Sequence, residues 1–554
     1  MSTYYSPTWT HIPDNLSISQ LMASGVGDIS PHKTIYEEAI TGKTVAYEPF
    51  RCQIRQTAYH LRHALSLQPG DIVSIIASSC IDYILTAQAV WWAGGIVSPI
   101  NNSLHPDEIF HALNLIKPRF VVVDETVYDK LPKALERNNT SCAIYTIGGI
   151  PSTEWPPLPL SQSSDTKGYL ELHTPITITG FNSKATCAAI LLSSGTTGAP
   201  KAVMLSHYNL VAACFQLRTD NPQNWRGSQR EIFFPPLSHV YALYVCFTMN
   251  LWLGAYVCLM PRFDVKLYCR LLQDRSATLA RIVPAVARVL AESPVAREYR
   301  YPDLEYFSCA AAPLHEETAG KLRKVFPGVA LCQTYGCTEL TGPCVQSGVR
   351  DKDLPLSASG TLISNTGIRF LDPDGKDVGS RGPGEIICRA PNVMMGYMHN
   401  VKETAEIILE GGWLRTGDLG YLDSKGYLYI YGRLKELIKY KGFQVAPAEL
   451  ENIIIQHALV EEAAVIGVWS ASQDTELPRA YVVLREDLRG YSNAAVLQEI
   501  SDFVSDKVSN YKRLRGGVVA IEALPRNTTG KVLKKVLKDK AANSDKERVL
   551  GPKL

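Results

Sequence analysis

Apolar positions in the first part of the chain form short runs that alternate with amphipathic segments. Residues 71–77 (DIVSIIA), 96–100 and 119–124 (RFVVVD) are apolar runs of strand length. Between them, residues 80–93 and 106–116 carry helical patterns. Strands that alternate with helices are typical of βαβ units, so the pattern predicts an α/β fold with a buried, largely parallel sheet. Such sheets bind nucleotides at the carboxyl ends of their strands.

The pattern changes in the second half of the chain. From about residue 355, short strands separated by glycine-rich turns predict a small antiparallel β unit, and a region of mixed helices and strands begins near Arg433. We therefore expect a large N-terminal body of βαβ subdomains plus a small β unit, residues 1–432, and a smaller mobile α+β C-terminal domain, residues 433–554. The helices expected in that domain are residues 447–457 and 494–508, and the strands are 462–468 and 479–484.

One apolar stretch, residues 242–260 (ALYVCFTMNLWLGAYVCLM), is nearly long enough to span a membrane. Asn250 and Gly254 interrupt it. A lone amide is costly in lipid, so the pattern favours a buried helix that ends near Gly254 and a buried strand after it. We expect no membrane span.

Charge and cysteine content narrow the functional classes. The chain has 554 residues, with 56 Lys and Arg against 54 Asp and Glu, so its formal charge of +2 gives no reason to expect nucleic-acid binding. An anionic ligand must be bound by local groups. The 13 cysteines contain no CxxC pair, and the N-terminus lacks the pattern of a secretory signal, so a reducing compartment is favoured.

The apolar run at residues 187–192 leads into a loop, SSGTTGAPK, that combines glycines, hydroxyl side chains and one lysine. These are the groups that surround a polyphosphate. The spacing differs from the common P-loop, and a flexible surface turn has a similar composition. The candidate phosphate-binding residues are Ser193, Ser194, Gly195, Thr196, Thr197, Gly198 and Lys201.

The segment SSGTTGAPKAVMLSH resembles the signature loop of the acyl-adenylate-forming superfamily, which includes acyl-CoA synthetases, luciferases and peptide-synthetase adenylation domains. Five further segments match that superfamily in order. They are PLSHVYAL at residues 236–243, QTYGCTE at 333–339, GWLRTGD at 412–418, GRLKELIKYKG at 432–442 and LPRNTTGK at 524–531. The run LKELIKYKGFQVAPAELE is most similar to the 4-coumarate:CoA ligase branch of acyl-CoA synthetases.

The resemblance implies that a carboxylic acid is joined to the α-phosphate of ATP and then transferred to coenzyme A. Both first reactants are anions, so the chemistry needs charge neutralisation and alignment. By resemblance, Lys201 and the loop hydroxyls contact the β- and γ-phosphates, Thr338 contacts the α-phosphate, and Glu339 holds Mg²⁺. Asp418 accepts hydrogen bonds from the ribose, and Arg433 supports it.

The resemblance also places the adenine and the acyl group. Tyr335 and Gly336 form the adenine floor, with Thr334 beside them. His239 has a pKa near neutrality, but a carboxylate substrate is already ionised, so we interpret His239 as part of the acyl tunnel and not as a general base. The residues expected around the acyl group are His239, Tyr241, Cys309, Ala310, Ala311, Gln333, Thr334 and Gly336.

Each half-reaction is expected to use a different part of the C-terminal domain. Lys531 resembles the lysine that stabilises charge during adenylation, and Lys435 falls at the hinge. Rotation about that hinge would withdraw Lys531 and bring another set of residues to the acyl-adenylate. That set comprises Lys439, Lys441, Gly442 and Gln444, and Arg262 is the cation expected at the CoA 3′-phosphate.

The sequence thus predicts an ATP- and Mg²⁺-dependent carboxylate–CoA ligase. The stretch 235–244 has no Asp to pair with an α-ammonium group, which argues against an amino-acid substrate. An aryl or phenylpropenoic acid and a medium-chain fatty or polyketide-derived acid both remain open. Alternatives are an acceptor other than CoA, either a carrier-protein thiol or oxygen as in luciferase, and a non-catalytic nucleotide-binding homologue.

Two further observations qualify this prediction. Ala202, Thr334 and Cys337 depart from the residues usual in the superfamily, and two of them bear on acyl specificity more than on activity. The chain ends in Pro552-Lys553-Leu554, close to the Ser-Lys-Leu peroxisomal address. We expect recognition by the peroxisomal import receptor, with the cytoplasm as the alternative location.

Overall fold

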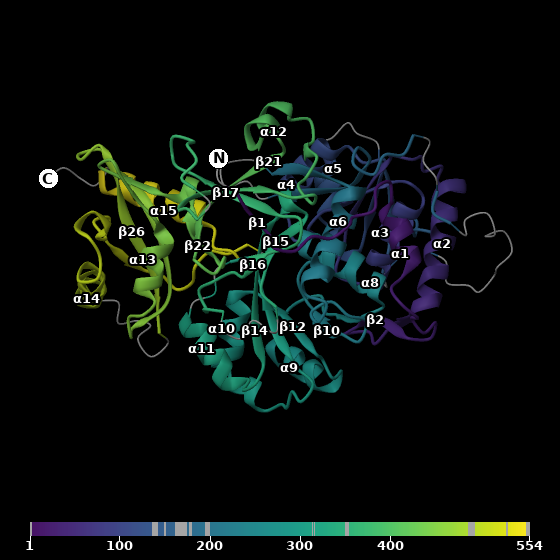
Figure 1. The fold of residues 1–554 in the computed structure, drawn as a ribbon, viewed down its shortest axis with the longest axis horizontal. Coiled ribbons are helices and arrows are strands. Elements are labelled where there is room, and N and C mark those ends of the chain that lie inside the picture. Colours follow the sequence, from purple (N-terminus) through teal and green to yellow (C-terminus); the bar gives the residue numbers. More distant parts are fainter. Residues whose placement is uncertain are drawn as a thin grey trace.

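The computed structural model shows a large body and a smaller C-terminal domain beside it, drawn in yellow-green at the left of Figure 1. It describes most of the chain: residues 3–135, 142–148, 151–160, 174–176, 180–193, 200–312, 314, 316–348, 354–379, 381–485, 494–527 and 530–549. The predicted mixed α/β architecture, with a large N-terminal domain and a small C-terminal one, is confirmed.

The first sheet of the large body contains the alternating strands predicted from the apolar runs. Its order is β19 (Gly396–Tyr397), β9 (Lys201–Ser206), β8 (Cys187–Ser193), β5 (Ile96–Pro99), β4 (Ile72–Ile76), β6 (Phe120–Val123) and β7 (Ala143–Thr146). The strands from β8 to β7 are parallel, whereas β9 and β19 join antiparallel. The crossover helices are α3 (Ile81–Trp92) and α4 (Pro106–Ile116), both as predicted.

Local signals define α4 well. His105 and Glu108 form a capping box, Pro106 occupies the first turn, and Lys117 ends the helix in the left-handed conformation. These are the start and stop signals that capping principles describe. The observed bounds of α4 agree with the predicted helix because these signals lie in its own end residues.

The second sheet continues the same architecture and contains the run that could have been mistaken for a membrane span. Its order is β16 (Thr361–Leu362), β15 (Gly342–Gln346), β14 (Ala330–Cys337), β13 (Tyr306–Cys309), β12 (Leu279–Ile282), β10 (Arg230–Phe233), β11 (Tyr256–Leu259), β2 (Thr34–Glu38) and β3 (Thr44–Ala46). The run forms buried helical segments, α7 (Val240–Ala242), η3 (Leu243–Met249) and α8 (Asn250–Leu253), followed by β11. Gly254 ends the helix in the left-handed conformation, so this prediction is confirmed. Among the described residues, no helix has both the length and the apolarity to cross a membrane.

A third, antiparallel sheet forms the predicted small β unit. It consists of β1 (Tyr4–Tyr5), β17 (Gly367–Leu371), β18 (Gly384–Arg389), β21 (Trp413–Leu422), β20 (Ile408–Leu409) and β22 (Leu428–Arg433). Helix α12 (Val401–Ile407) lies between β19 and β20 in the chain and packs near both. Because β21 and β22 are hydrogen-bonded neighbours, Asp418 of one motif lies opposite Arg433 of the next motif.

The C-terminal domain has its own sheet and helices. Its elements are the hairpin β23 (Ile438–Tyr440) and β24 (Phe443–Val445), the sheet β25 (Val460–Ser470), β26 (Thr475–Leu484) and β27 (Val518–Ala520), and helices α13 (Pro447–Ile454), α14 (Ala494–Ser505) and α15 (Lys534–Val549). The helices and strands predicted here are confirmed. The predicted boundary after residue 432 falls near the end of β22, and the hinge at Lys435 lies in the short turn η6 (Leu434–Glu436). Both stay predictions.

Candidate active site

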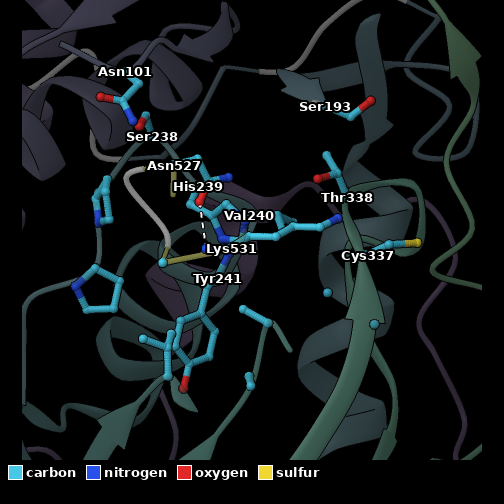
Figure 2. Close-up of a pocket in the computed structure, with 18 of the residues that line it drawn as sticks. Asn101, Ser193, Ser238, His239, Val240, Tyr241, Cys337, Thr338, Asn527 and Lys531 are labelled. Atoms are coloured by element: carbon cyan, nitrogen blue, oxygen red, sulfur yellow. Dashed lines mark hydrogen bonds between the residues drawn. The ribbon is translucent and has the colours of Figure 1, made fainter. Parts of the chain in front are cut away.

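A cavity of about 1020 Å³ lies where the two large sheets, the β unit and the C-terminal domain meet. Its volume matches that of pockets for small organic ligands and cofactors. Figure 2 shows part of its lining, with Lys531 of the C-terminal domain extending across the pocket toward Thr338. The cavity therefore collects residues from most of the segments singled out in the sequence.

The described ends of the glycine-rich loop stand at one wall of the cavity. Ser193 ends β8, Lys201 begins β9, and the two residues are register partners across the strands. The Lys201 ammonium makes an ion pair with Glu403 of α12 and lies 4.8 Å from the centre of the Tyr397 ring. The remaining predicted loop residues, Ser194, Gly195, Thr196, Thr197 and Gly198, lie outside the described residues.

The end of β14 and the turn after it form the next part of the wall. Thr334, Gly336, Thr338 and Glu339 all line the cavity. A Cβ at Gly336 would stand 1.9 Å from the Gly342 carbonyl oxygen, so only glycine fits this close approach of two strands. Cys337, one of the departures noted in the sequence, also lines the cavity.

Asp418 lies at the β21–β22 pair, almost fully buried, with 5% of its surface exposed. Its two oxygens receive different partners: Arg433 at 3.0 Å and the Tyr335 hydroxyl at 2.8 Å. Burial raises the pKa of the Asp418 carboxyl, and the Arg433 charge opposes that rise. Of the two residues predicted for the adenine floor, Gly336 lines the cavity, while Tyr335 reaches Asp418 through its hydroxyl.

His239 lines the cavity at the start of α7. Its Nδ1 accepts the Tyr241 backbone N–H at 3.2 Å, which assigns the proton of the neutral ring to Nε2. Burial lowers the pKa of the His239 imidazole to about 4, so the ring is neutral at pH 7. A neutral Nε2–H is a hydrogen-bond donor, which suits contact with substrate oxygen and not proton abstraction.

The acyl end of the cavity is defined by the alternation of side chains on parallel strands. Tyr241, Ala310 and Ala311 line it. Cys309 and Gln333 do not: they are register partners on β13 and β14, and Cys309 is buried in a hydrophobic cluster. Their position follows from the strand period of two, because Thr334, next to Gln333, faces the cavity.

Lys531 is brought into the cavity by a tight turn of the C-terminal domain. Its backbone N–H donates to Asn527 Oδ1 at 2.8 Å, and Gly530 adopts a positive φ of 81° at the turn. Burial, reinforced by the nearby Arg433 charge, lowers the pKa of the Lys531 ammonium to about 8. Lys531, Arg433 and Lys201 thus bring positive charge to one cavity.

The hairpin residues predicted for the CoA step lie outside the cavity. Four residues of the β23–β24 hairpin are exposed and do not line the cavity: Lys439, Lys441, Gly442 and Gln444. Arg262 and Lys435 do line it, and both are exposed at its edge. The structure therefore presents the groups expected for adenylation and holds the hairpin away from them.

Glu339 is the side chain predicted to bind magnesium, and its surroundings decide how the ion could be held. Glu339 Oε1 accepts a hydrogen bond from the Tyr397 hydroxyl at 3.0 Å. Among the described residues, no group of three or more His, Cys, Asp or Glu side chains is spaced to hold a metal ion. Mg²⁺ commonly takes one or two carboxylates together with substrate phosphates and water. Glu339 therefore fits an ion carried mainly by the nucleotide phosphates.

Sequence reasoning missed two residues of this site, Tyr397 and Glu403. They belong to the segment GYMHNVKET, which lies outside the six matched motifs. Asn400 caps α12 by accepting from the Glu403 N–H at 3.1 Å, so a helix-start signal was present. Nothing in that local signal indicates that β19 pairs with β9 and so brings Tyr397 to Lys201.

Comparison with known proteins gives a consistent result. The AMP-binding enzyme family matches residues 28–398, and the AMP-binding enzyme C-terminal domain matches residues 449–531. A probable 4-coumarate–CoA ligase 1 of Dictyostelium discoideum is 32% identical over 550 residues, covering 97% of this chain and 98% of the relative. ATP-bound MatB from Rhodopseudomonas palustris is 26% identical with a TM-score of 0.81, over 95% of this chain and 99% of that one. Apo MatB, at 27% identity and the same coverage, has a TM-score of 0.72.

The chain therefore belongs to the AMP-binding enzyme family. Within it, the chain is an enzyme of the AMP-forming acyl-CoA ligase family. ATP is the nucleotide that this family binds. The fold of the chain matches the ATP-bound form of MatB with a higher TM-score than the apo form.

Proposed function

We propose that this enzyme activates an aryl or phenylpropenoic acid with ATP and transfers the acyl group to coenzyme A. The observation that carries the proposal is one cavity that contains Lys201, Thr338 and Lys531 together with an acyl end lined by Tyr241 and Ala310. Cations and a hydroxyl at one end and a largely apolar recess at the other fit the two anionic reactants and an acyl body.

In the first step, a carboxylate oxygen attacks the α-phosphorus of ATP, and the bond to the β-phosphate oxygen breaks. Pyrophosphate leaves, and no proton is transferred, so no general base is required. Lys201 and Lys531 would offset the negative charge that gathers on the phosphates, and Thr338 would align the α-phosphate. Magnesium at Glu339, when bound, would neutralise charge on the phosphate oxygens. His239 would donate a hydrogen bond from Nε2.

In the second step, the CoA sulfur attacks the acyl carbonyl carbon, and the bond to the AMP oxygen breaks. The thiol loses its proton to solvent, and AMP leaves as an anion. Lys439 and Gln444 would act here once the C-terminal domain has rotated about Lys435, and Arg262 would meet the CoA 3′-phosphate. Lys439 and Gln444 are exposed outside the cavity, which supports a division of labour between the two arrangements.

The acyl end favours an acid that carries a polar group on a ring. The Thr334 hydroxyl is buried and, among the described residues, has no hydrogen-bond partner, whereas the Tyr241 hydroxyl lies close to Arg281 and Ser308. A polar substituent on a ring could satisfy the Thr334 hydroxyl, whereas a plain alkyl chain could not. A medium-chain fatty or polyketide-derived acid is the second candidate, because Val240 and Pro343 give the recess apolar walls.

The test is pyrophosphate release by the purified protein with ATP and Mg²⁺ against cinnamic, hydroxycinnamic, benzoic and C6 to C18 fatty acids, with and without CoA. The expected result is release that depends on an aryl acid, with its CoA thioester in the products. Dependence on fatty acids alone would overturn the aryl assignment. Acid-dependent release without a thioester would replace CoA by another acceptor, and no release with any acid would contradict catalysis on these substrates.

We also propose that residues 552–554, Pro-Lys-Leu, direct the protein to peroxisomes. They lie outside the described residues. A fluorescent protein fused to the N-terminus should give peroxisomal puncta, and removal of the tripeptide should make the fluorescence cytosolic. Unchanged import after its removal would contradict the proposal.

A further inference from the structure

Tyr397 stands between Lys201, which is expected to meet the ATP phosphates, and Glu339, which is expected to hold Mg²⁺. Its hydroxyl donates to Glu339 Oε1 at 3.0 Å, and its ring face carries the Lys201 ammonium 4.8 Å from the ring centre. Tyr397 is only 7% exposed, so both contacts are made by a buried side chain. Lys201 begins β9 of the first sheet, Glu339 lies in the turn between β14 and β15 of the second, and the Tyr397 side chain contacts both.

The backbone around Tyr397 fixes the side chain in this place. β19 pairs antiparallel with β9, with Tyr397 opposite Val203, only two residues from Lys201. The Tyr397 N–H donates to Thr404 Oγ1 at 2.9 Å, which ties the strand to α12. A side chain held at both its backbone and its hydroxyl loses little further entropy when a ligand binds.

The chemistry of each contact suits a positioning role. A phenol hydroxyl is protonated at neutral pH, so Tyr397 is the donor to Glu339. Its bond uses Oε1 of Glu339 and orients the carboxylate. The ring attracts the Lys201 ammonium from one side while Glu403 pairs with it. Phosphates can replace Glu403 as the partner of Lys201 without disturbing the ring contact.

We propose that Tyr397 is a positioning residue for ATP activation: its hydroxyl orients the Glu339 carboxylate toward the nucleotide-bound cation, and its ring places Lys201 for the phosphates. The proposal concerns nucleotide and metal only, so it does not depend on which acid or acceptor the enzyme uses. It does require the metal role proposed for Glu339.

Two variants separate the two contacts. Tyr397→Phe keeps the ring and removes the hydroxyl, whereas Tyr397→Leu removes both. ATP binding is measured by titration calorimetry in EDTA and over a series of Mg²⁺ concentrations, and Mn²⁺ binding to the ATP complex is measured by electron paramagnetic resonance. For Tyr397→Phe we expect ATP affinity in EDTA to be unchanged. The metal concentration that half-saturates the ATP complex should rise about 10-fold. For Tyr397→Leu we expect an additional loss of ATP affinity in EDTA of about 3-fold.

Matched controls distinguish positioning from simple packing. Tyr256 is also buried and donates to a carboxylate, Glu37 Oε2, at 2.5 Å, but neither residue lines the cavity. Tyr256→Phe should lower the melting temperature and leave the metal dependence unchanged. An unchanged metal dependence in Tyr397→Phe, or an equal change in Tyr256→Phe, would overturn the proposal. If Glu339→Gln also leaves the metal dependence unchanged, the metal role of Glu339 fails first.

Discussion

Two lysine-bearing segments of the C-terminal domain have opposite environments. Lys531 lies inside the cavity, where burial lowers the pKa of its ammonium to about 8. Lys439, on the β23–β24 hairpin, is exposed to solvent and does not line the cavity. Both belong to one small folded unit, so its sheet and helices cannot bring both to the same substrate at once. On the roles proposed for the two lysines, this arrangement serves acyl-AMP formation, and thioester formation would need a rearrangement.

The hairpin is nevertheless a well-ordered part of the domain. The Lys439 backbone N–H donates to Glu476 Oε2 at 2.8 Å, and Lys441 N–H donates to Thr475 Oγ1 at 2.8 Å. These bonds fix the hairpin to the start of β26. It can therefore be delivered to the cavity as a rigid body when the whole domain turns.

The largest effect is expected at Lys531. Lys531→Ala removes a cation that faces the developing charge in the cavity, so the rate of acyl-AMP formation should fall about 10²- to 10³-fold. Thioester formation from acyl-AMP added in place of acid and ATP should remain close to normal. Single-turnover measurement of each half-reaction makes this comparison. Lys535→Ala, on the exposed side of α15, is the control. Equal losses in both half-reactions would contradict the division between the segments.

The reciprocal change is at the hairpin. Lys439→Ala should slow thioester formation from added acyl-AMP about 10-fold or more, because an exposed lysine that never entered the site would have no effect on it. Acyl-AMP formation should be unaffected. The control is Lys538→Ala, an exposed lysine of the same domain. A loss confined to acyl-AMP formation would reverse our assignment of the two segments.

The pH dependence sharpens the same contrast. Adenylation needs charged Lys531, whose pKa is lowered to about 8, so kcat/KM for ATP should fall as pH rises above about 8, by about tenfold per unit at the limit. Lys531→Arg should move this fall to higher pH, because a guanidinium stays charged. The thioester step should not show this dependence on Lys531.

The stability of the fold should respond to pH in the opposite direction to the activity. The unfolded chain binds a proton at Lys531 that the folded chain has lost between pH about 8 and the ordinary 10.5. The contribution of this site to the free energy of unfolding therefore increases as the pH rises across that range. Denaturant titrations of the wild type and Lys531→Met at pH 8 and pH 10 check the sign.

The sequence predicted elements with strong local signals and motifs with many fixed residues. Helix α4 was predicted from its helical pattern, and the helix ending at Gly254 followed from one glycine in an apolar run. Gly336 and Thr338 were found because their motif is long and specific. Such information is contained in neighbouring residues.

What could not be predicted depends on contacts between distant segments. Cys309 and Gln333 were expected at the acyl group, but the strand period turns both away from the cavity, and only the register of β13 and β14 shows it. Tyr397 was missed because its role arises from the pairing of β19 with β9. The ion pairs of Arg288 with Glu461 and Glu462 of the C-terminal domain likewise join residues more than 170 positions apart.

Those interdomain ion pairs provide the smallest expected effect. Arg288, on α10 (Pro284–Glu292) of the large body, pairs with both Glu461 and Glu462 of β25. Arg526, four residues before Gly530, also pairs with Glu462, at 2.7 Å. The Arg526 pair lies within the C-terminal domain, whereas the two Arg288 pairs join that domain to the large body in the arrangement that places Lys531 in the cavity. The proposed rotation would break the Arg288 pairs. The pairs are partly exposed, so salt should weaken them.

Arg288→Ala should therefore slow acyl-AMP formation only about 2- to 5-fold, and should leave thioester formation from added acyl-AMP unchanged or faster. The ratio of the two single-turnover rates, measured at low and high salt, is the readout. In the wild type the ratio should fall with salt, and in Arg288→Ala it should be nearly independent of salt. Lys43→Ala removes an ion pair with Asp82 of 2.6 Å within the large body and should preserve the salt response. A wild-type salt response in Arg288→Ala would show that these pairs do not bias the domain, and the contrast between Lys531 and Lys439 would then need another source.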